Sequence, residues 1–273
     1  MKLAIPPTIL AAGLALAACQ TSFAATVILD DTFDDGTLET NPGTGGGFTY
    51  LDNGQGTGTA TEGGSLARIT EAGGSSTAGI ISNNAFDLSD NSLTYTTTWE
   101  VGSADFGSSG DIERIFLSMQ TNADFIFAGG AEESRLLVEI NAQSNSAYLR
   151  YQNRSGGSNS NFTTSLFDLG VFNGDLDGFT AMITFDLNGF AFATSGLDAT
   201  NQVNISDTWA NLGTDFATAF QTDGDMHLSG FIQDRSTTGA TLDFDRIMLT
   251  SVPEPGTALL SAIGVLALLR RRR

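Results

Sequence analysis

Short runs of β-branched and aromatic residues dominate the sequence, and Gly-, Ser- and Asn-rich breaks separate them. In the clearest run, residues 92–101 (S-L-T-Y-T-T-T-W-E-V), every second residue from Leu93 to Val101 falls on one face. Successive side chains of a strand point to opposite faces, so this period of two predicts a strand with one buried face. Proline is nearly absent between residues 25 and 251. The pattern predicts an all-β sandwich.

The same reasoning predicts strands along most of residues 25–251. Segments 134–142 and 147–152 are expected to pair as a hairpin, and so are 179–187 and 189–194. The Gly-, Ser- and Asn-rich segments 43–47, 54–64 and 155–161 are expected to be loops. The other predicted strands are 26–29, 48–51, 66–70, 79–82, 112–121, 162–169, 226–233 and 240–249.

One segment breaks the strand pattern. In residues 207–220, Trp209, Leu212, Phe216 and Phe220 recur every three to four positions, and Asp207 is available as an N-cap. This spacing predicts one short amphipathic helix.

The predicted domain is strongly acidic. Residues 25–251 contain seven arginines, no lysine and 30 of the 31 acids, so the formal charge is 7 − 30 = −23. Because phosphate binding needs a basic face, nucleic acid is excluded as a partner. Most of these charges are interpreted as a solvated acidic surface, although carboxylates also suit divalent cations.

The first 24 residues have the parts of a secretory signal peptide: Lys2, an apolar stretch and a small-residue site before Ala25. Cleavage between Ala24 and Ala25 is predicted, with the Sec translocon and signal peptidase as partners. The alternative is a lipidated N-terminus at Cys19, because Leu-Ala-Ala-Cys resembles a bacterial lipobox. Signal peptide cleavage is favoured, and it would remove the only cysteine of the chain.

The last 22 residues join three parts without a spacer. Val252 leads into Pro253-Glu254-Pro255 and Gly256, an apolar run covers 257–269, and four arginines end the chain. The prolines hold the first part extended for a processing enzyme. As a helix the apolar run spans roughly 20 Å, short of the bilayer core of about 30 Å. Long arginine side chains reach the cytoplasmic interface and compensate for this length. The predicted membrane-retention residues are Arg270, Arg271, Arg272 and Arg273.

This order of parts resembles the PEP-CTERM sorting segment, which an exosortase recognises in the membrane. The resemblance implies a bacterial protein that is transiently anchored in the inner membrane, cut at or near Pro253 to Pro255, and delivered to the cell surface or extracellular matrix. An ordinary C-terminal membrane anchor is the alternative. The predicted organisation is therefore a signal peptide (1–24), a β-sandwich ectodomain (25–251) and a sorting segment (252–273).

The ectodomain resembles the concanavalin A-like jelly roll, the fold of legume-type lectins and laminin G-like modules. The resemblance rests on strand number and on two acidic segments, residues 31–36 and 242–247. It implies that the first and last strands are neighbours and hold a structural calcium ion, with Asp31, Asp34, Asp243 and Asp245 as candidate ligands. The alternative is that these acids form a polar outer face opposite Leu242 and Phe244.

Catalytic chemistry has little support in the sequence. His227 is the only histidine, and the Asp111-Ile112-Glu113 segment lacks the third acid of jelly-roll glucanases. No enzyme activity is therefore expected. Sugar binding needs an aromatic platform with polar neighbours, for which Trp99, Trp209, Tyr148 and Tyr151 are candidates, although core packing is the preferred interpretation.

The predicted function is that of an exported structural or adhesive module associated with exopolysaccharide. A lectin-like carbohydrate-binding domain is the alternative, and a polysaccharide-degrading enzyme is the third.

Overall fold

The computed structural model describes residues 24–254, apart from 42, 53–57, 73–75, 107–112, 122, 124–132, 142–145, 156–157, 169–174, 196–203, 209–224 and 235–238. These residues form strands only, and none of them lies in a helix. The strands are β1 (Thr26–Asp31), β2 (Phe48–Asp52), β3 (Thr59–Glu62), β4 (Ala67–Glu71), β5 (Ser76–Ser82), β6 (Phe86–Asp87), β7 (Leu93–Asp105), β8 (Glu113–Gln120), β9 (Glu133–Asn141), β10 (Ser146–Ser155), β11 (Ser158–Asp168), β12 (Asp175–Phe185), β13 (Gly189–Ser195), β14 (Asn204–Thr208), β15 (Asp225–Asp234) and β16 (Ala240–Pro253).

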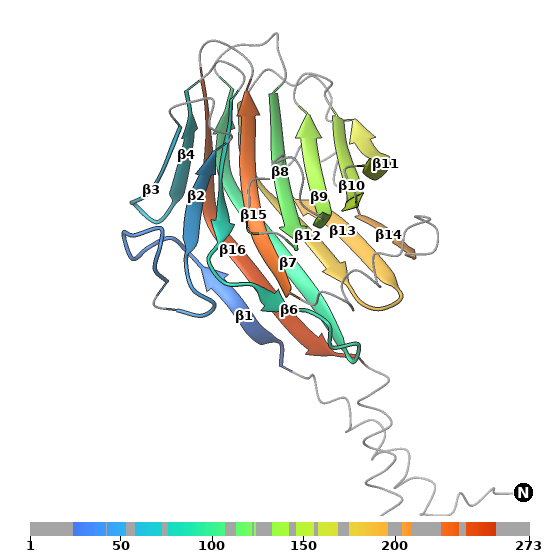
Figure 1. Cartoon of the computed structure of the whole chain (residues 1–273). Coiled ribbons are helices and arrows are strands. Elements are labelled where there is room, and N and C mark those ends of the chain that lie inside the picture. The colour runs from blue at the N-terminus through green and yellow to red at the C-terminus, as the bar shows by residue number, and fades with distance from the viewer. Residues whose placement is uncertain are drawn as a thin grey trace, which may run out of the picture.

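The strands form two antiparallel sheets that stack face to face, as Figure 1 shows. Sheet A has the order β14-β13-β12-β7-β16-β4-β3, and β1 also pairs with β16. Sheet B has the order β11-β10-β9-β8-β15-β5-β2, and β6 also pairs with β15. Two layers of antiparallel strands around one core are the architecture of a jelly-roll sandwich.

The hydrophobic core lies between the two sheets. The two-residue alternation along each strand determines which side chains point into it. On β7, Tyr95, Thr97, Trp99 and Val101 are all buried, as the alternation predicts. On β9, Leu136, Val138 and Ile140 are likewise buried together. The sheets approach closely where β15 crosses β16, because a Cβ atom on Gly230 would lie 2.3 Å from the Phe244 ring. Because Gly230 has no side chain, the Phe244 ring of sheet A can pack directly against the backbone of sheet B.

The longest ladder of the molecule joins the last strand to β7. Twelve residue pairs connect β16 to β7, from Thr241 opposite Asp105 to Pro253 opposite Leu93. On the other side of β16, β4 covers the first part and β1 the last, with Thr26 opposite Ser251. The first and last strands are thus neighbours, as the jelly-roll resemblance implies. We call the end where β1 begins and β16 finishes the proximal end, which lies at the bottom of Figure 1.

Most strands predicted from the sequence are present, including both hairpins. The turn of the β12–β13 hairpin closes with a bond from Asp186 N to Gly189 O at 3.0 Å. The loop predictions were partly wrong, because β3 lies within 54–64 and because β10 and β11 extend into 155–161. The short strands β6 and β14 were not predicted. The predicted boundary between Ser251 and Val252 falls inside β16.

The predicted helix does not start at its proposed N-cap. Asp207, the proposed N-cap, and Thr208 belong to β14, where Asp207 pairs with Phe190 of β13. In β14, the backbone N–H and C=O groups that a helix would pair internally are paired with the neighbouring strand β13. The helical spacing of apolar residues therefore does not extend back to Asp207. The rest of the segment, 209–220, lies outside the described residues. Among those that are described, no helix has the length and apolarity to cross a bilayer.

Candidate functional sites

The sorting motif begins inside the sandwich. Val252 lies opposite Thr94 and Pro253 opposite Leu93, both on β7. Glu254 extends this contact, since its backbone N–H donates to Ser92 O at 2.9 Å. The side chains of all three motif residues are half-buried. Pro255, Gly256, the apolar run and the terminal arginines lie outside the described residues.

The predicted start of the mature chain lies beside this motif. Ala24 and Ala25 are exposed and precede β1, whose first residue, Thr26, is opposite Ser251 of β16. The two predicted processing positions are therefore at the same, proximal end of sheet A. Residues 1–23, including Cys19, lie outside the described residues, so signal peptide cleavage and lipidation both remain predictions.

The acidic turn after β1 holds a buried carboxylate. Asp31 is only 3% exposed, its Oδ1 accepts from Phe33 N at 2.9 Å, and its Oδ2 is buried without a hydrogen-bond partner. Burial raises the pKa of Asp31 to about 6, and the nearby carboxylates of Asp35 and Asp34 add to the effect. Burial also raises the pKa of Glu62, whose Oε1 accepts from Gly36 N at 2.7 Å. The carboxylates of Asp31 and Glu62 are therefore costly to keep ionised.

The four candidate calcium ligands do not converge. Asp31 lies opposite Ile247 and shares its core-facing side, whereas Asp243 points to the outer face of sheet A. There Arg68 donates to both carboxylate oxygens of Asp243, at 2.8 and 2.7 Å, and Ser103 Oγ donates at 3.0 Å. Asp34 and Asp245 are exposed. Within the described ranges, no group of three or more His, Cys, Asp or Glu residues is arranged to hold a metal ion.

The reason for this divergence is a pair of bulges in the β16–β7 ladder, one on each strand. The register against β7 shifts between Asp243 and Phe244 and again between Phe244 and Arg246. Asp245 is the extra residue, so the alternation changes phase from Leu242 and Phe244 to Ile247 and Leu249. Asp243 lies on the polar outer face, which is the alternative that the sequence left open.

The outer face of sheet B carries a second set of buried side chains. Phe116, Leu137 and Phe231 form a small apolar cluster on this face. Beside it, Ser118 Oγ and Ser229 Oγ are 2.6 Å apart, and both donate to Gln120 Oε1, at 3.0 and 3.2 Å. Such a face mixes polar and apolar side chains, whereas Ile115, Leu117 and Met119 of β8 point into the apolar core on the inner face.

A buried ion pair lies on the same outer face. Arg114 Nε is 3.2 Å from Glu139 Oε1, and the Glu139 side chain is fully buried. His227, also on this face, is fixed by the contact of its Nδ1 with Ser82 O at 2.8 Å. Sequence reasoning gave His227 no catalytic role and missed Glu139, which no motif distinguishes from the other acids.

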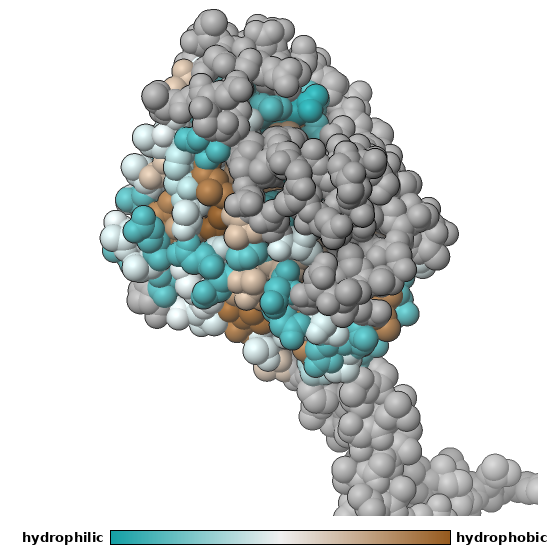
Figure 2. Space-filling view, in the orientation of Figure 1, coloured by the Kyte–Doolittle hydropathy of each residue, from teal (hydrophilic) through white to brown (hydrophobic). Residues whose placement is uncertain are grey.

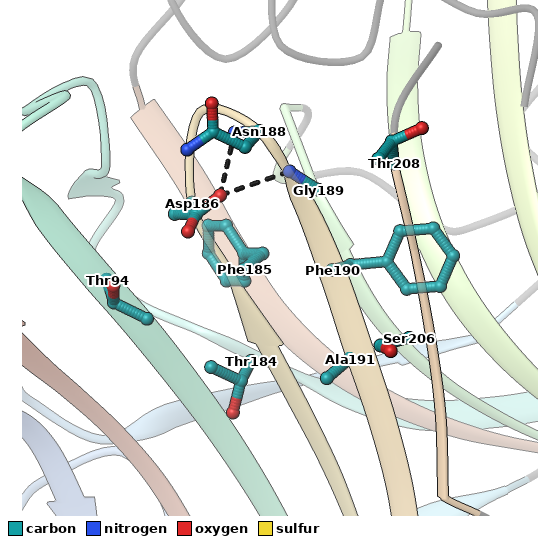
Figure 3. Close-up of a pocket in the computed structure, with 10 residues that line it drawn as sticks. All are labelled: Thr94, Thr184, Phe185, Asp186, Asn188, Gly189, Phe190, Ala191, Ser206 and Thr208. Carbon is teal, nitrogen blue, oxygen red and sulfur yellow. Dashed lines mark hydrogen bonds between the residues drawn. The ribbon is translucent and has the colours of Figure 1, made fainter. Parts of the chain in front are cut away.

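An open pocket of about 450 Å³ lies at the proximal end of sheet A. Figure 3 shows it around the β12–β13 hairpin, with Thr94 of β7 on one side and Ser206 and Thr208 of β14 on the other. Asp186 Oδ1 accepts from Asn188 N at 2.7 Å and from Gly189 N at 3.0 Å, which fixes the hairpin turn. The lining is Thr94, Thr184, Phe185, Asp186, Asn188, Gly189, Phe190, Ala191, Ser206 and Thr208.

Trp99, the one aromatic candidate for sugar stacking whose side chain the structure describes, does not line this pocket. Trp99 is fully buried in the core, and its Nε1 has no hydrogen-bond partner. Trp209 and the side chains of Tyr148 and Tyr151 lie outside what the structure describes. The aromatic residues of the pocket are Phe185 and Phe190, both at least nine-tenths buried, and Phe185 also stacks on Tyr95 with ring centroids 5.6 Å apart. The sequence did not predict this pocket, because its lining residues come from β7, β12, β13 and β14 and meet only through strand pairing.

Exposed apolar side chains are sparse on the described surface. Where Figure 2 colours the front of the molecule, it shows mainly hydrophilic and intermediate residues, with separate brown patches. The large hydrophobic residues most exposed in the described part are Val27, Met182 and Leu187, at 42%, 38% and 40%. All three belong to β1 or to the β12–β13 hairpin of sheet A.

Comparison with known proteins identifies the tail and the fold. Residues 251–273 match the family model described as the PEP-CTERM protein-sorting motif. No curated protein sequence matches the chain significantly. The basic winged bean lectin superimposes with a TM-score of 0.54 at 10% identity, covering 84% of this chain and 99% of the lectin.

Two other solved structures have the same architecture. Arcelin-5, a lectin-like defense protein from Phaseolus vulgaris, gives a TM-score of 0.53 at 13% identity, with 84% of this chain and 99% of arcelin-5 covered. An endo-1,3-beta-glucanase from Streptomyces sioyaensis gives 0.50 at 13% identity, with 84% and 97% covered. At these identities the likeness shows the fold alone. The chain combines a two-sheet sandwich of the fold seen in these lectins with a C-terminal PEP-CTERM protein-sorting motif, which points to export and to processing by an exosortase.

Proposed function

We propose that the sandwich is a non-catalytic structural or adhesive module of the exopolysaccharide matrix, delivered there after exosortase processing. The observation that carries this proposal is the continuity of the PEP-CTERM motif with the last core strand. Because no linker separates them, removal of the tail delivers the whole sandwich as one unit. Its charge of 7 − 30 = −23 over residues 25–251 favours solubility outside the cell and disfavours binding to nucleic acid.

Cell fractionation tests the delivery. In cells that contain the matching peptidase, the wild-type protein is expected in the surface or matrix fraction without its four terminal arginines. Deletion of the peptidase, or replacement of Pro253, Glu254 and Pro255 by alanine, is expected to retain the full chain in the membrane. Arg270→Lys is the matched control, since it keeps the charge. Equal release of all these variants would contradict the proposal.

Carbohydrate binding is the second candidate, and the pocket at the β12–β13 hairpin favours it. Hydroxyl and amide side chains of Thr184, Asn188, Ser206 and Thr208 line a volume of about 450 Å³ beside two phenylalanines. Sugar recognition needs such polar groups together with an apolar surface. The mature domain is expected to bind a set of glycans on an array, and the double variant Asn188→Ala/Ser206→Ala is expected to lose this binding. Thr61→Ala, on β3 of the same sheet, is the control.

An enzymatic role is the third candidate. Glycoside hydrolysis needs two carboxylates about 5–10 Å apart, one of them free to exchange a proton. Glu139 forms an ion pair with Arg114, and Asp243 forms one with Arg68. We therefore expect no release of reducing sugar from exopolysaccharide. Release that is lost in Glu139→Gln would establish an enzyme and overturn the non-catalytic proposal.

A further inference from the structure

The tip of the β12–β13 hairpin carries an Asn-Gly pair, Asn188 and Gly189. Asn188 is exposed, and Gly189 is the first residue of β13. In such a pair the backbone nitrogen of the glycine can attack the side-chain amide carbon of the asparagine, because glycine has no side chain to shield that nitrogen. The hairpin tip therefore holds the two groups that deamidation of asparagine requires.

One carboxylate holds this pair in place. Asp186 Oδ1 accepts from Asn188 N at 2.7 Å and from Gly189 N at 3.0 Å, and Figure 3 shows both bonds at the turn. The backbone N–H of Asp186 in turn donates to Gly189 O at 3.0 Å. Gly189 is therefore bonded to Asp186 through both its N–H and its C=O.

The turn differs from the usual hairpin turn of an Asn-Gly pair. In two-residue hairpin loops Asn-Gly adopts a positive φ at both residues. Positive φ values occur in the described chain at residues such as Gly36 and Gly239, but not at Asn188 or Gly189. Here the Asp186 side chain accepts from the backbone two and three residues ahead, which is how aspartate builds a turn of its own.

These contacts oppose deamidation in two ways. Gly189 N attacks only after it loses its proton, and a carboxylate that accepts this N–H disfavours the loss, because a second negative charge would form beside the first. The attack also requires rotation about the backbone bonds of Asn188, so that Gly189 N can reach Asn188 Cγ. This rotation would break the bonds to Asp186 and disturb the pairing of Phe185 with Phe190.

We propose that Asn188 is a site of spontaneous deamidation and that Asp186 protects it by holding Gly189 in the turn. In the unprotected reaction Gly189 N forms a bond to Asn188 Cγ, and the side-chain nitrogen leaves as ammonia with the proton from Gly189 N. Water then opens the cyclic imide at one of its two carbonyl carbons, which gives aspartate or isoaspartate at position 188. The proposal does not depend on whether the domain binds sugar.

Either product would change the hairpin or the pocket. Isoaspartate adds one carbon to the backbone of the turn, which is incompatible with the present register of Phe185 opposite Phe190. Both products place a second carboxylate near Asp186 in a pocket that is otherwise lined by hydroxyl, aromatic and small side chains. Protection by Asp186 therefore keeps the register of the hairpin and the charge of the pocket constant.

Peptide mass spectrometry tests the proposal. The exported protein is incubated at a mildly alkaline pH, both folded and in urea, and the peptide that contains Asn188 is analysed for conversion of the amide to a carboxyl group and for isoaspartate. The folded protein is expected to deamidate at Asn188 at least tenfold more slowly than the protein in urea. Rates within about twofold of each other would show that the fold gives no protection and would overturn the proposal.

Two variants at position 186 test the role of the carboxylate. Asp186→Ala removes the acceptor and is expected to deamidate at Asn188 about tenfold faster than the wild type. Asp186→Asn is the matched control, since its amide oxygen can accept the same two N–H groups, and it is expected to react more slowly than Asp186→Ala. Equal rates in the two variants would contradict protection by the turn, and slower reaction in Asp186→Ala would mean that the carboxylate acts as a base.

The other two Asn-Gly pairs of the chain, at Asn53 and Asn173, provide an internal reference in the same samples. The increase in Asp186→Ala is expected at Asn188 alone, because only this pair is bonded to Asp186. An increase at Asn188 that is no larger than the increase at Asn53 and Asn173 would contradict a local protection and overturn the proposal.

Discussion

At the scale of single residues, two of the four acids that the sequence grouped as candidate calcium ligands differ in environment. Asp31 points toward the core with one oxygen unpartnered, whereas Asp243 is bonded by Arg68 and Ser103 on the outer face. The sequence shows both as acids beside apolar strand residues. Only the register of β1 on β16, and the bulge at Asp245, decide which face each one occupies.

Replacing Asp31 by Asn should change how stability depends on pH. Since burial raises the pKa of Asp31 to about 6, the folded chain binds a proton that the unfolded chain has released above pH 3.8. Wild-type stability should therefore fall as pH rises from about 4 through 6, by on the order of 2–3 kcal/mol from this group. Urea unfolding of Asp31→Asn at pH 4 and pH 7.5 should lack this loss. The same pH dependence in both proteins would contradict the account.

The Arg68–Asp243 pair gives a second prediction at this scale. Arg68→Met should destabilise the domain by about 1–2 kcal/mol, because it leaves the buried Asp243 carboxylate with Ser103 alone. The double variant Arg68→Met/Asp243→Asn should lose less than the sum of the two single changes. Denaturant unfolding of the four proteins measures this coupling. Strict additivity would show that the pair contributes nothing.

At the scale of elements, the period of two was a reliable guide where one face of a strand is buried. It identified β7 and β9 correctly, including their core residues. It failed for β3 (Thr59–Glu62), whose short run lies among glycines, and for β14, whose place in the sheet depends on β13. Edge strands bury few side chains and so leave little alternation in the sequence.

The crossing of β15 over β16 supplies a prediction for these elements. Gly230→Ala would place a Cβ atom 2.3 Å from Cζ of Phe244, so the two sheets would have to separate locally. We expect a loss of about 1–3 kcal/mol in the free energy of unfolding, as in other overpacked cores. Gly63→Ala, whose Cβ would meet nothing within 4 Å, is the control and should unfold like the wild type. Equal stability of the two variants would refute the close approach.

At the scale of the whole molecule, charge dominates the solution behaviour. A formal charge of 7 − 30 = −23 over residues 25–251 favours expansion through self-repulsion. Raising NaCl from 0.02 to 0.5 M shortens the Debye length several-fold and should raise the urea midpoint of the mature domain. A midpoint that falls with salt would mean that ion pairs such as Asp30–Arg246 outweigh the repulsion.

The sorting motif was readable from the sequence, because it is recognised by its order of parts and not by tertiary contacts. The two-layer fold was readable from the alternation. The pocket beside Asn188 and the burial of Glu139 were not, since each depends on strands far apart in the chain. How the motif joins the fold was also hidden, because β16 crosses the predicted domain boundary.

The intact mass of the extracellular protein tests the central claim most directly. It should be measured in parallel from cells with the peptidase and from an otherwise identical strain without it. The account predicts a shorter mass, with the apolar run and the four arginines removed, only when the peptidase is present. A full-length chain held in the membrane of peptidase-containing cells, or the same truncated mass in both strains, would contradict it.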